Sequence, residues 1–206
     1  MKTKDYLQDI KEIKNMMSQS TQFISLSGLS GVLAGIYALI GAYLASRVLP
    51  QPKYFETNAS WYDPQEITNN LILIAISILL LSVGTAYIMT VGKAKSIGET
   101  VWNTSSKRLL INFCIPLFTG GILALLLLKQ SVYDLIAPIT LIFYGLACVN
   151  ASKYTLRDVR YLGLTQIVLG LISVEFSGYG LYFWALGFGV FHILYGSVMY
   201  FKYDRN

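Results

Sequence analysis

The sequence predicts an all-α integral membrane protein, a bundle of six transmembrane helices with both termini in the cytoplasm. Hydrophobic residues make up 54% of the 206-residue chain and charged residues only 13%, whereas a soluble domain carries about 25% charged residues. Several stretches of about twenty residues contain no charged side chain, which is the length that crosses roughly 30 Å of hydrocarbon. Basic residues gather on one side of these stretches, as they do in the cytoplasmic loops of membrane proteins.

The chain divides into an N-terminal cytoplasmic segment, residues 1–21, and a single transmembrane domain, residues 22–206. Within the first segment Tyr6, Ile10, Ile13 and Met17 recur at helical spacing, which predicts an amphipathic helix. Such a helix lies either on the cytoplasmic leaflet or against the loops of its own protein. The predicted spans are residues 22–48, 69–91, 109–128, 133–150, 159–176 and 179–200.

Two of these helices are preceded by residues that favour a helix start. Asp63, Pro64 and Glu66 form a capping-box pattern with proline at the first helical position, which leads into the second span. Ser131 and Asp134 repeat the pattern before the fourth span. Both helices are therefore expected to begin close to these residues.

The orientation follows from the distribution of Lys and Arg. With six spans, 13 of the 16 basic residues fall on the side that holds both termini, and retained basic loops mark the cytoplasm. We therefore expect a protein of the bacterial cytoplasmic membrane whose net charge of +5 serves its orientation. The basic residues form no recognition motif, so nucleic acid is not expected as a partner.

A short pattern recurs in the odd-numbered spans. Residues 35–39, 121–125 and 170–174 each read Gly, Ile or Leu, any residue, a small residue and an aliphatic residue. This similarity predicts three similar two-helix hairpins related by an axis along the membrane normal. Matches of five residues also arise easily by chance in a chain rich in Gly and Leu, so coincidence is the alternative.

Small residues predict where helices pack closely, because they let two backbones approach in lipid. One such stripe lies in the first span and another in the sixth, where the stripe also contains His192. The residues of the two stripes are Ser27, Gly31 and Gly35 in the first and Ala185, Gly189 and Gly196 in the second. The sequence leaves open whether each stripe contacts a helix of the same chain or of another copy.

Polar residues near the middle of a span are candidates for a functional site. Gln166 and His192 are the two such residues here, and adjacent antiparallel helices would bring them together. A glutamine amide can hydrogen-bond either imidazole nitrogen. The favoured interpretation is an interhelical hydrogen bond, and the alternative is a ligand site or a proton pathway.

The third span contains a proline. Pro116 has no N–H to donate to the carbonyl of Asn112, which predicts a kink at this point. Such a kink is either a static packing feature, which we favour, or a hinge.

Motifs of enzymes are absent from the sequence: there is no HExxH, no GxSxG elbow, no Walker A loop and no pair of intramembrane carboxylates. A single histidine and two cysteines predict no cofactor and no metal site. The sequence therefore favours a non-enzymatic role in sensing, anchoring or regulation, with the lipid bilayer, a membrane or cytoplasmic protein or a second copy as partner. The alternative is a small transporter or channel for a neutral or lipid-like substrate.

Overall fold

The structure is a computed structural model, and it describes residues 23, 25–49, 63–98 and 100–205. The amphipathic segment predicted for residues 1–21 lies outside the described residues. The helices are α2 (Gly28–Val48), α3 (Pro64–Ser96), α4 (Thr104–Lys129), α5 (Ile136–Ala151), α6 (Asp158–Glu175), and a C-terminal helix built from α7 (Gly180–Trp184), η3 (Ala185–Phe191), α8 (His192–Met199) and η4 (Tyr200–Asp204). The prediction of an all-helical protein is confirmed for the described residues.

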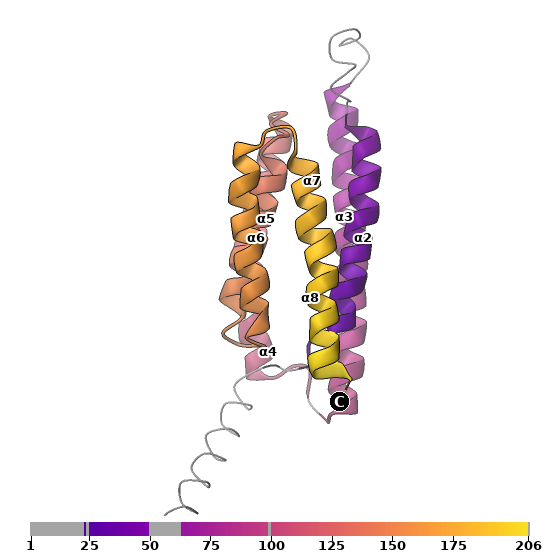
Figure 1. Ribbon diagram of the computed structural model, residues 1–206, viewed down its shortest axis with the longest axis vertical. Coiled ribbons are helices and arrows are strands. Elements are labelled where there is room, and N and C mark those ends of the chain that lie inside the picture. The colour runs from indigo at the N-terminus through magenta and orange to yellow at the C-terminus, as the bar shows by residue number, and fades with distance from the viewer. Residues whose placement is uncertain (1–22, 24, 50–62, 99, 206) are drawn as a thin grey trace, which may run out of the picture.

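Within the described residues, four helices are long and apolar enough to cross a membrane. They are α2, α3, α4 and the C-terminal helix, which has 25 residues. The helix α5 has 16 residues and α6 has 18. Along the described chain, the helices run roughly along one axis (Figure 1).

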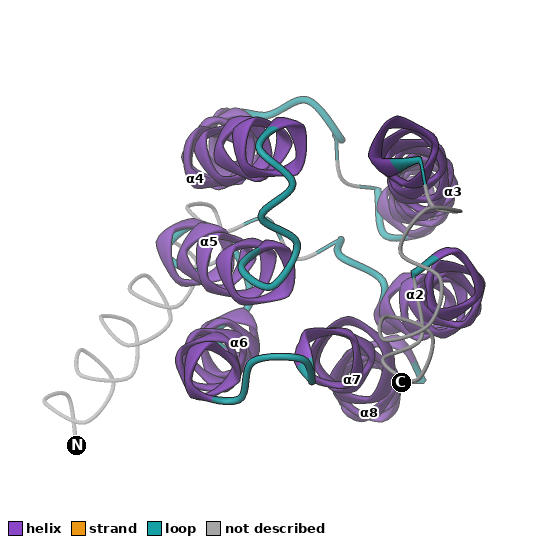
Figure 2. Cartoon of the chain, turned by 90° about the horizontal axis from the view of Figure 1, so that it is seen from above, coloured by secondary structure: helices purple, strands orange, loops and turns teal. Residues whose placement is uncertain are grey.

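The helices form two groups of three. In one group α2 lies between α3 and the C-terminal helix, and in the other α5 lies between α4 and α6 (Figure 2). We call them the α2 group and the α5 group. They meet where α7 and η3 pack against α5 and α6.

Capping residues account for several helix starts. Asp63 accepts a hydrogen bond from the N–H of Gln65, and Pro64 occupies the first helical position, as the sequence predicts. Asn103 and Ser106 form a reciprocal capping box at the start of α4, which the sequence analysis missed.

The predicted cap of the fourth helix is wrong. The helix α5 begins at Ile136 after Leu135, whose side chain makes no capping bond. Ser131 instead adopts a positive φ of 60° in the turn that follows α4. Asp134 accepts a hydrogen bond from the hydroxyl of Ser177, so its carboxylate joins two loops and does not cap a helix.

The first helix begins at Gly28 and not at the predicted Gln22. Phe23 forms an isolated parallel β-bridge with Thr155. The N–H of Phe23 donates to the carbonyl of Tyr154, and the hydroxyl of Thr155 donates to the carbonyl of Phe23. Because Phe23 is engaged by the α5–α6 loop, the chain is extended here.

Glycine lets the helices of each group approach closely. A β-carbon at Gly145 of α5 would lie 2.6 Å from the carbonyl oxygen of Gly163 of α6, and one at Gly163 would lie 2.7 Å from the carbonyl oxygen of Gly145. Neither glycine has room for a side chain, so the two backbones are in direct contact.

The two predicted small-residue stripes face each other within one chain. A β-carbon at Gly35 would lie 2.7 Å from the carbonyl oxygen of Gly189, and one at Gly31 would lie 3.3 Å from the α-carbon of Gly196. The helix α2 therefore packs on the C-terminal helix through backbone contacts. Ser27 precedes α2 as its N-cap residue, and Ala185 begins η3.

The repeat of three hairpins stays a prediction. The helices α2 and α3 pack along each other, as do α4 and α5, whereas α6 and the C-terminal helix share far less contact. The third hairpin is thus more open than the other two.

The contact between Gly145 and Gly163 gives a test of this packing. Gly145→Ala places a methyl group against backbone that cannot move aside, so we expect the free energy of unfolding to fall by about 1–3 kcal/mol. Gly84→Ala is the matched control, because a β-carbon there meets nothing within 4 Å and alanine favours a helix over glycine by roughly 0.5–1 kcal/mol. Reversible unfolding in mixed detergent measures both variants, and equal effects would contradict the packing.

Candidate functional site

A short π-helical stretch interrupts the C-terminal helix at the level where the two groups meet. It runs from Ala185 to Phe191. Single π-helical turns are rare in helices and are found often at functional sites. Gly187 lies in this stretch and is buried.

The carbonyl oxygen of Gly187 accepts two side-chain hydrogen bonds. Nε2 of Gln166, on α6, donates to it at 2.8 Å. Nδ1 of His192, one turn further along the C-terminal helix, lies 3.0 Å from the same oxygen. Gln166 and His192 are both buried, and their shared acceptor brings them together.

The hydrogen bonds of His192 fix the position of its proton. A carbonyl oxygen can only accept, so Nδ1 of His192 carries the hydrogen. In the neutral ring Nε2 is then an acceptor, and the hydroxyl of Tyr144 on α5 lies 2.7 Å from it. The chain Tyr144, His192, Gly187 and Gln166 thereby links α5 and α6 to the C-terminal helix.

Aromatic rings enclose the histidine end of this chain. The ring of Tyr144 lies edge-on to Phe113, with 5.9 Å between centroids, and Phe188 stacks on His192 at 5.7 Å. Trp184 contacts Phe188 at 4.9 Å. These rings exclude water from the imidazole, which strengthens its hydrogen bonds.

Two polar side chains of α6 keep a buried atom without a hydrogen-bond partner: Oε1 of Gln166 and Oγ of Ser173. A β-carbon at Gly187 would lie 2.5 Å from Oε1 of Gln166, so this oxygen lies against the α-carbon of Gly187. A contact of that kind gives a weak C–H to oxygen bond. The amide of Gln166 therefore contacts Gly187 through both of its polar atoms: Nε2 donates to the carbonyl oxygen, and Oε1 lies against the α-carbon.

The structure corrects the expected pairing of Gln166 with His192. The two side chains do not bond to each other, and each binds the carbonyl of Gly187. Sequence reasoning missed both Gly187 and Tyr144. A backbone acceptor has no sequence signal. Tyr144 did have one, because a tyrosine within a predicted span needs a hydrogen-bond partner for its hydroxyl.

The proline of α4 has a partner for the carbonyl that it leaves free. Pro116 lies inside a continuous helix. Nδ2 of Asn150, at the end of α5, donates to the carbonyl oxygen of Asn112 at 3.0 Å, while the side chain of Asn112 donates to the carbonyl of Arg108. Asn112 and Pro116 are therefore part of a satisfied contact between α4 and α5, and the kink, static or hinged, stays a prediction.

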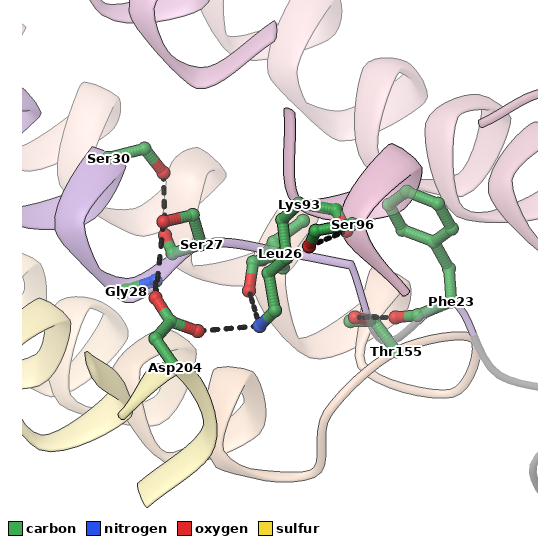
Figure 3. A network of polar contacts seen from close by, with 9 residues as sticks. All are labelled: Phe23, Leu26, Ser27, Gly28, Ser30, Lys93, Ser96, Thr155 and Asp204. Atoms are coloured by element: carbon green, nitrogen blue, oxygen red, sulfur yellow. Dashed lines mark hydrogen bonds and ion pairs between the residues drawn. The ribbon is translucent and has the colours of Figure 1, made fainter. Parts of the chain in front are cut away.

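A second polar network ties the C-terminal end of the chain to the start of α2 (Figure 3). Asp204 accepts from the N–H of Gly28 at 2.8 Å and from the hydroxyl of Ser27 at 3.2 Å. Lys93, near the end of α3, forms an ion pair with Asp204 and donates to the carbonyl of Leu26. One carboxylate thus holds α2, α3 and the C-terminal helix together.

The α5 group has a matching ion pair at the same end. Asp158, the first residue of α6, accepts from Lys202 at 2.7 Å and from the hydroxyl of Tyr203 at 2.8 Å. Partial burial raises the pKa of the Asp158 carboxyl, but the two hydrogen bonds outweigh it and hold the pKa below its ordinary value. Asp158 is therefore ionised at neutral pH and fastens the C-terminal helix to α6.

The described residues hold no group of three or more His, Cys, Asp or Glu side chains that could bind a metal ion. Cys114 and Cys148 are both free thiols. The chain matches no known family model, no curated protein and no solved structure. The geometry by itself defines the class: a helical protein with several helices that can cross a membrane and a buried network of hydrogen bonds between them.

Removing Asn150 tests whether it satisfies the carbonyl of Asn112. Asn150→Leu leaves that carbonyl without a donor, and we expect a loss of about 1–2 kcal/mol in the free energy of unfolding. In a Pro116→Ala background, residue 116 supplies its own N–H to Asn112, so the same substitution is expected to cost clearly less. The four proteins form a double-mutant cycle measured by unfolding in mixed detergent.

An equal cost of Asn150→Leu in the two backgrounds would contradict this role. A variant of an exposed residue on the same pair of helices, Thr119→Ala, is the control. Its hydroxyl bonds only to the carbonyl of Ile115, so its effect should be the same in both backgrounds.

Proposed function

We propose that the chain is a six-span protein of the bacterial cytoplasmic membrane, with both termini in the cytoplasm and a non-enzymatic role in sensing, anchoring or regulation. The role is exerted through contacts with lipid or with a protein partner in the membrane. The observation that carries this proposal is the surface of α3, supported by the way in which the interior uses its polar groups.

The helix α3 has apolar side chains on all sides and, among the described helices, packs along α2 only. None of the residues in its most apolar 18-residue window is buried, and the corresponding share for α4 is 11%. Ile76, Leu80 and Ile88 are each more than half exposed. A helix that is hydrophobic all round needs an apolar environment, so lipid or a partner protein must cover it.

The two shorter helices fit six crossings. At about 1.5 Å per residue, α5 and α6 are roughly 24 and 27 Å long, which is close to the hydrocarbon thickness. The helix α5 packs along α4, and α6 packs against the C-terminal helix (Figure 2). With six crossings the basic residues divide 13 to 3 in favour of the side with the termini.

Interior polar groups support a role that does not involve chemistry. The amide of Gln166, the imidazole of His192 and the hydroxyl of Tyr144 are engaged with one another through Gly187. Bonds of this kind between membrane helices contribute about 0.6 kcal/mol on average. They hold helices in place, and none of these three side chains is directed at a substrate as a nucleophile or base.

A small transporter for a neutral or lipid-like substrate is the second candidate. The buried hydroxyl of Ser173 has no hydrogen-bond partner among the described residues and favours it, because a polar ligand inside the bundle would find a bonding partner there. The helix α6 and the C-terminal helix, which form the more open third hairpin, would move apart to let such a ligand pass.

Native mass spectra of the protein released from its own membrane separate these functions. We expect the wild type to carry a protein partner, a second copy or lipid, and Gln166→Leu and His192→Leu to leave that bound mass unchanged. Thr165→Leu is the control, because Thr165 is exposed on α6, the helix of Gln166. Its hydroxyl donates to the backbone carbonyl of Tyr161.

A small molecule lost in Gln166→Leu and His192→Leu but kept in Thr165→Leu would overturn the proposal in favour of transport. Absence of any partner across several mild detergents and after cross-linking would also contradict it. The orientation is checked separately with single cysteines at Asn58 and Lys153 in a Cys-free background. They should be labelled from opposite sides of the membrane, and labelling from the same side would contradict six crossings.

A further inference from the structure

One end of the bundle carries five cations that form no ion pair with a carboxylate of the described residues. We call Lys107 and Arg108 of α4, Lys153 of the α5–α6 loop, and Arg157 and Arg160 at the start of α6 the cationic rim. All five are exposed. At this end, the carboxylates among the described residues are Asp158 and Asp204, which pair with Lys202 and Lys93.

Asp204 and Asp158 are both taken up by ion pairs with Lys93 and Lys202. Within the described part of the chain, the five positive charges of the cationic rim are therefore left unpaired. Asp204 is mostly buried, with its side chain 10% exposed, and also holds Gly28 and Ser27, so it is not available to the rim. Asp158 is bound by Lys202 and Tyr203.

Helix stability does not explain two of these cations. Lys107 and Arg108 lie in the first turns of α4, where the helix dipole disfavours positive charge. The capping box of Asn103 and Ser106 already satisfies the start of this helix. The cations therefore oppose the dipole at this helix start, and an anion bound beside them would offset that cost.

Exposed aromatic residues lie beside the rim. Trp102 is 61% exposed just before α4, and Tyr161 is 66% exposed next to Arg160. Trp and Tyr gather at the level of lipid headgroups, where one part of the ring is in an apolar environment and the other is hydrated. Their position next to the rim places the five cations at the headgroup layer.

We propose that the cationic rim binds the phosphate headgroups of anionic lipids in the cytoplasmic leaflet, and that the protein thereby responds to the anionic lipid content of its membrane. This rests on the proposed function in one respect, namely that this end of the bundle faces the cytoplasm. It names the ligand class for the sensing or anchoring role. Each basic residue close to an anionic membrane surface contributes about 1 kcal/mol, so five of them make a selective site.

Quenching of Trp102 by brominated lipid tests this inference. The protein, with Trp61→Phe and Trp184→Phe, is placed in nanodiscs of phosphatidylcholine that contain increasing fractions of brominated phosphatidylglycerol or of brominated phosphatidylcholine. We expect brominated phosphatidylglycerol to quench Trp102 at a several-fold lower fraction than brominated phosphatidylcholine. Arg108→Gln with Arg160→Gln should reduce that preference at least about fivefold.

The control removes two cations from the opposite end of the bundle, Arg47→Gln with Lys129→Gln, both of which are exposed. It should keep the preference of the wild type. Equal quenching by the two lipids in the wild type, or an equal loss in both double variants, would overturn the inference. Labelling of single cysteines tests independently whether this end of the bundle faces the cytoplasm, so failure of the lipid site and failure of the proposed function are told apart.

Discussion

The carbonyl of Gly187 is the point on which the joining of the two helix groups depends. In lipid every backbone polar group needs a partner within the protein, and a π-helical stretch changes the regular pattern of backbone bonds. Here Gln166 and His192 come from different helices to bind the same carbonyl oxygen. Tyr144 extends the contact to α5, so one backbone atom organises three helices.

The remaining packing follows from glycine and from two ion pairs. Gly145 against Gly163 sets the distance between α5 and α6, and Gly31 and Gly35 set the distance between α2 and the C-terminal helix. At the end that we place in the cytoplasm, Asp204 and Asp158 anchor the same C-terminal helix to α2 and to α6. That helix is therefore fixed at its end by charge and at its middle by neutral hydrogen bonds, in keeping with the high cost of burying a charge in lipid.

Much of this architecture could be predicted from composition and spacing. Helix content, the approximate positions of the helices and the two small-residue stripes depend on local sequence, and the structure places the stripes against each other. The start of the first helix could not be predicted, because Phe23 is held by Thr155, a contact across more than 130 residues. The cap predicted at Ser131 and Asp134 failed for a similar reason, since Asp134 is bound by Ser177.

In the candidate site too, local features could be predicted from the sequence and contacts between helices could not. Gln166 and His192 could be selected because each lies near the middle of a predicted span, but their common acceptor is a backbone atom, which carries no sequence signal. The partner of Asn112 was likewise hidden, because Asn150 lies at the end of its helix and meets that carbonyl only once α4 and α5 are packed. Contacts within a helix can be anticipated from spacing, whereas contacts between helices depend on the packing itself.

A double-mutant cycle of Gln166→Leu and His192→Phe tests the role of the Gly187 carbonyl most directly, with the free energy of unfolding in mixed detergent as the measured quantity. Each single variant leaves one donor on the shared oxygen, whereas the double variant removes both. We therefore predict that the double variant is destabilised by more than the sum of the single variants, by roughly 0.5–2 kcal/mol. Strict additivity within about 0.3–0.5 kcal/mol would show that the two side chains do not share this acceptor and would contradict the account.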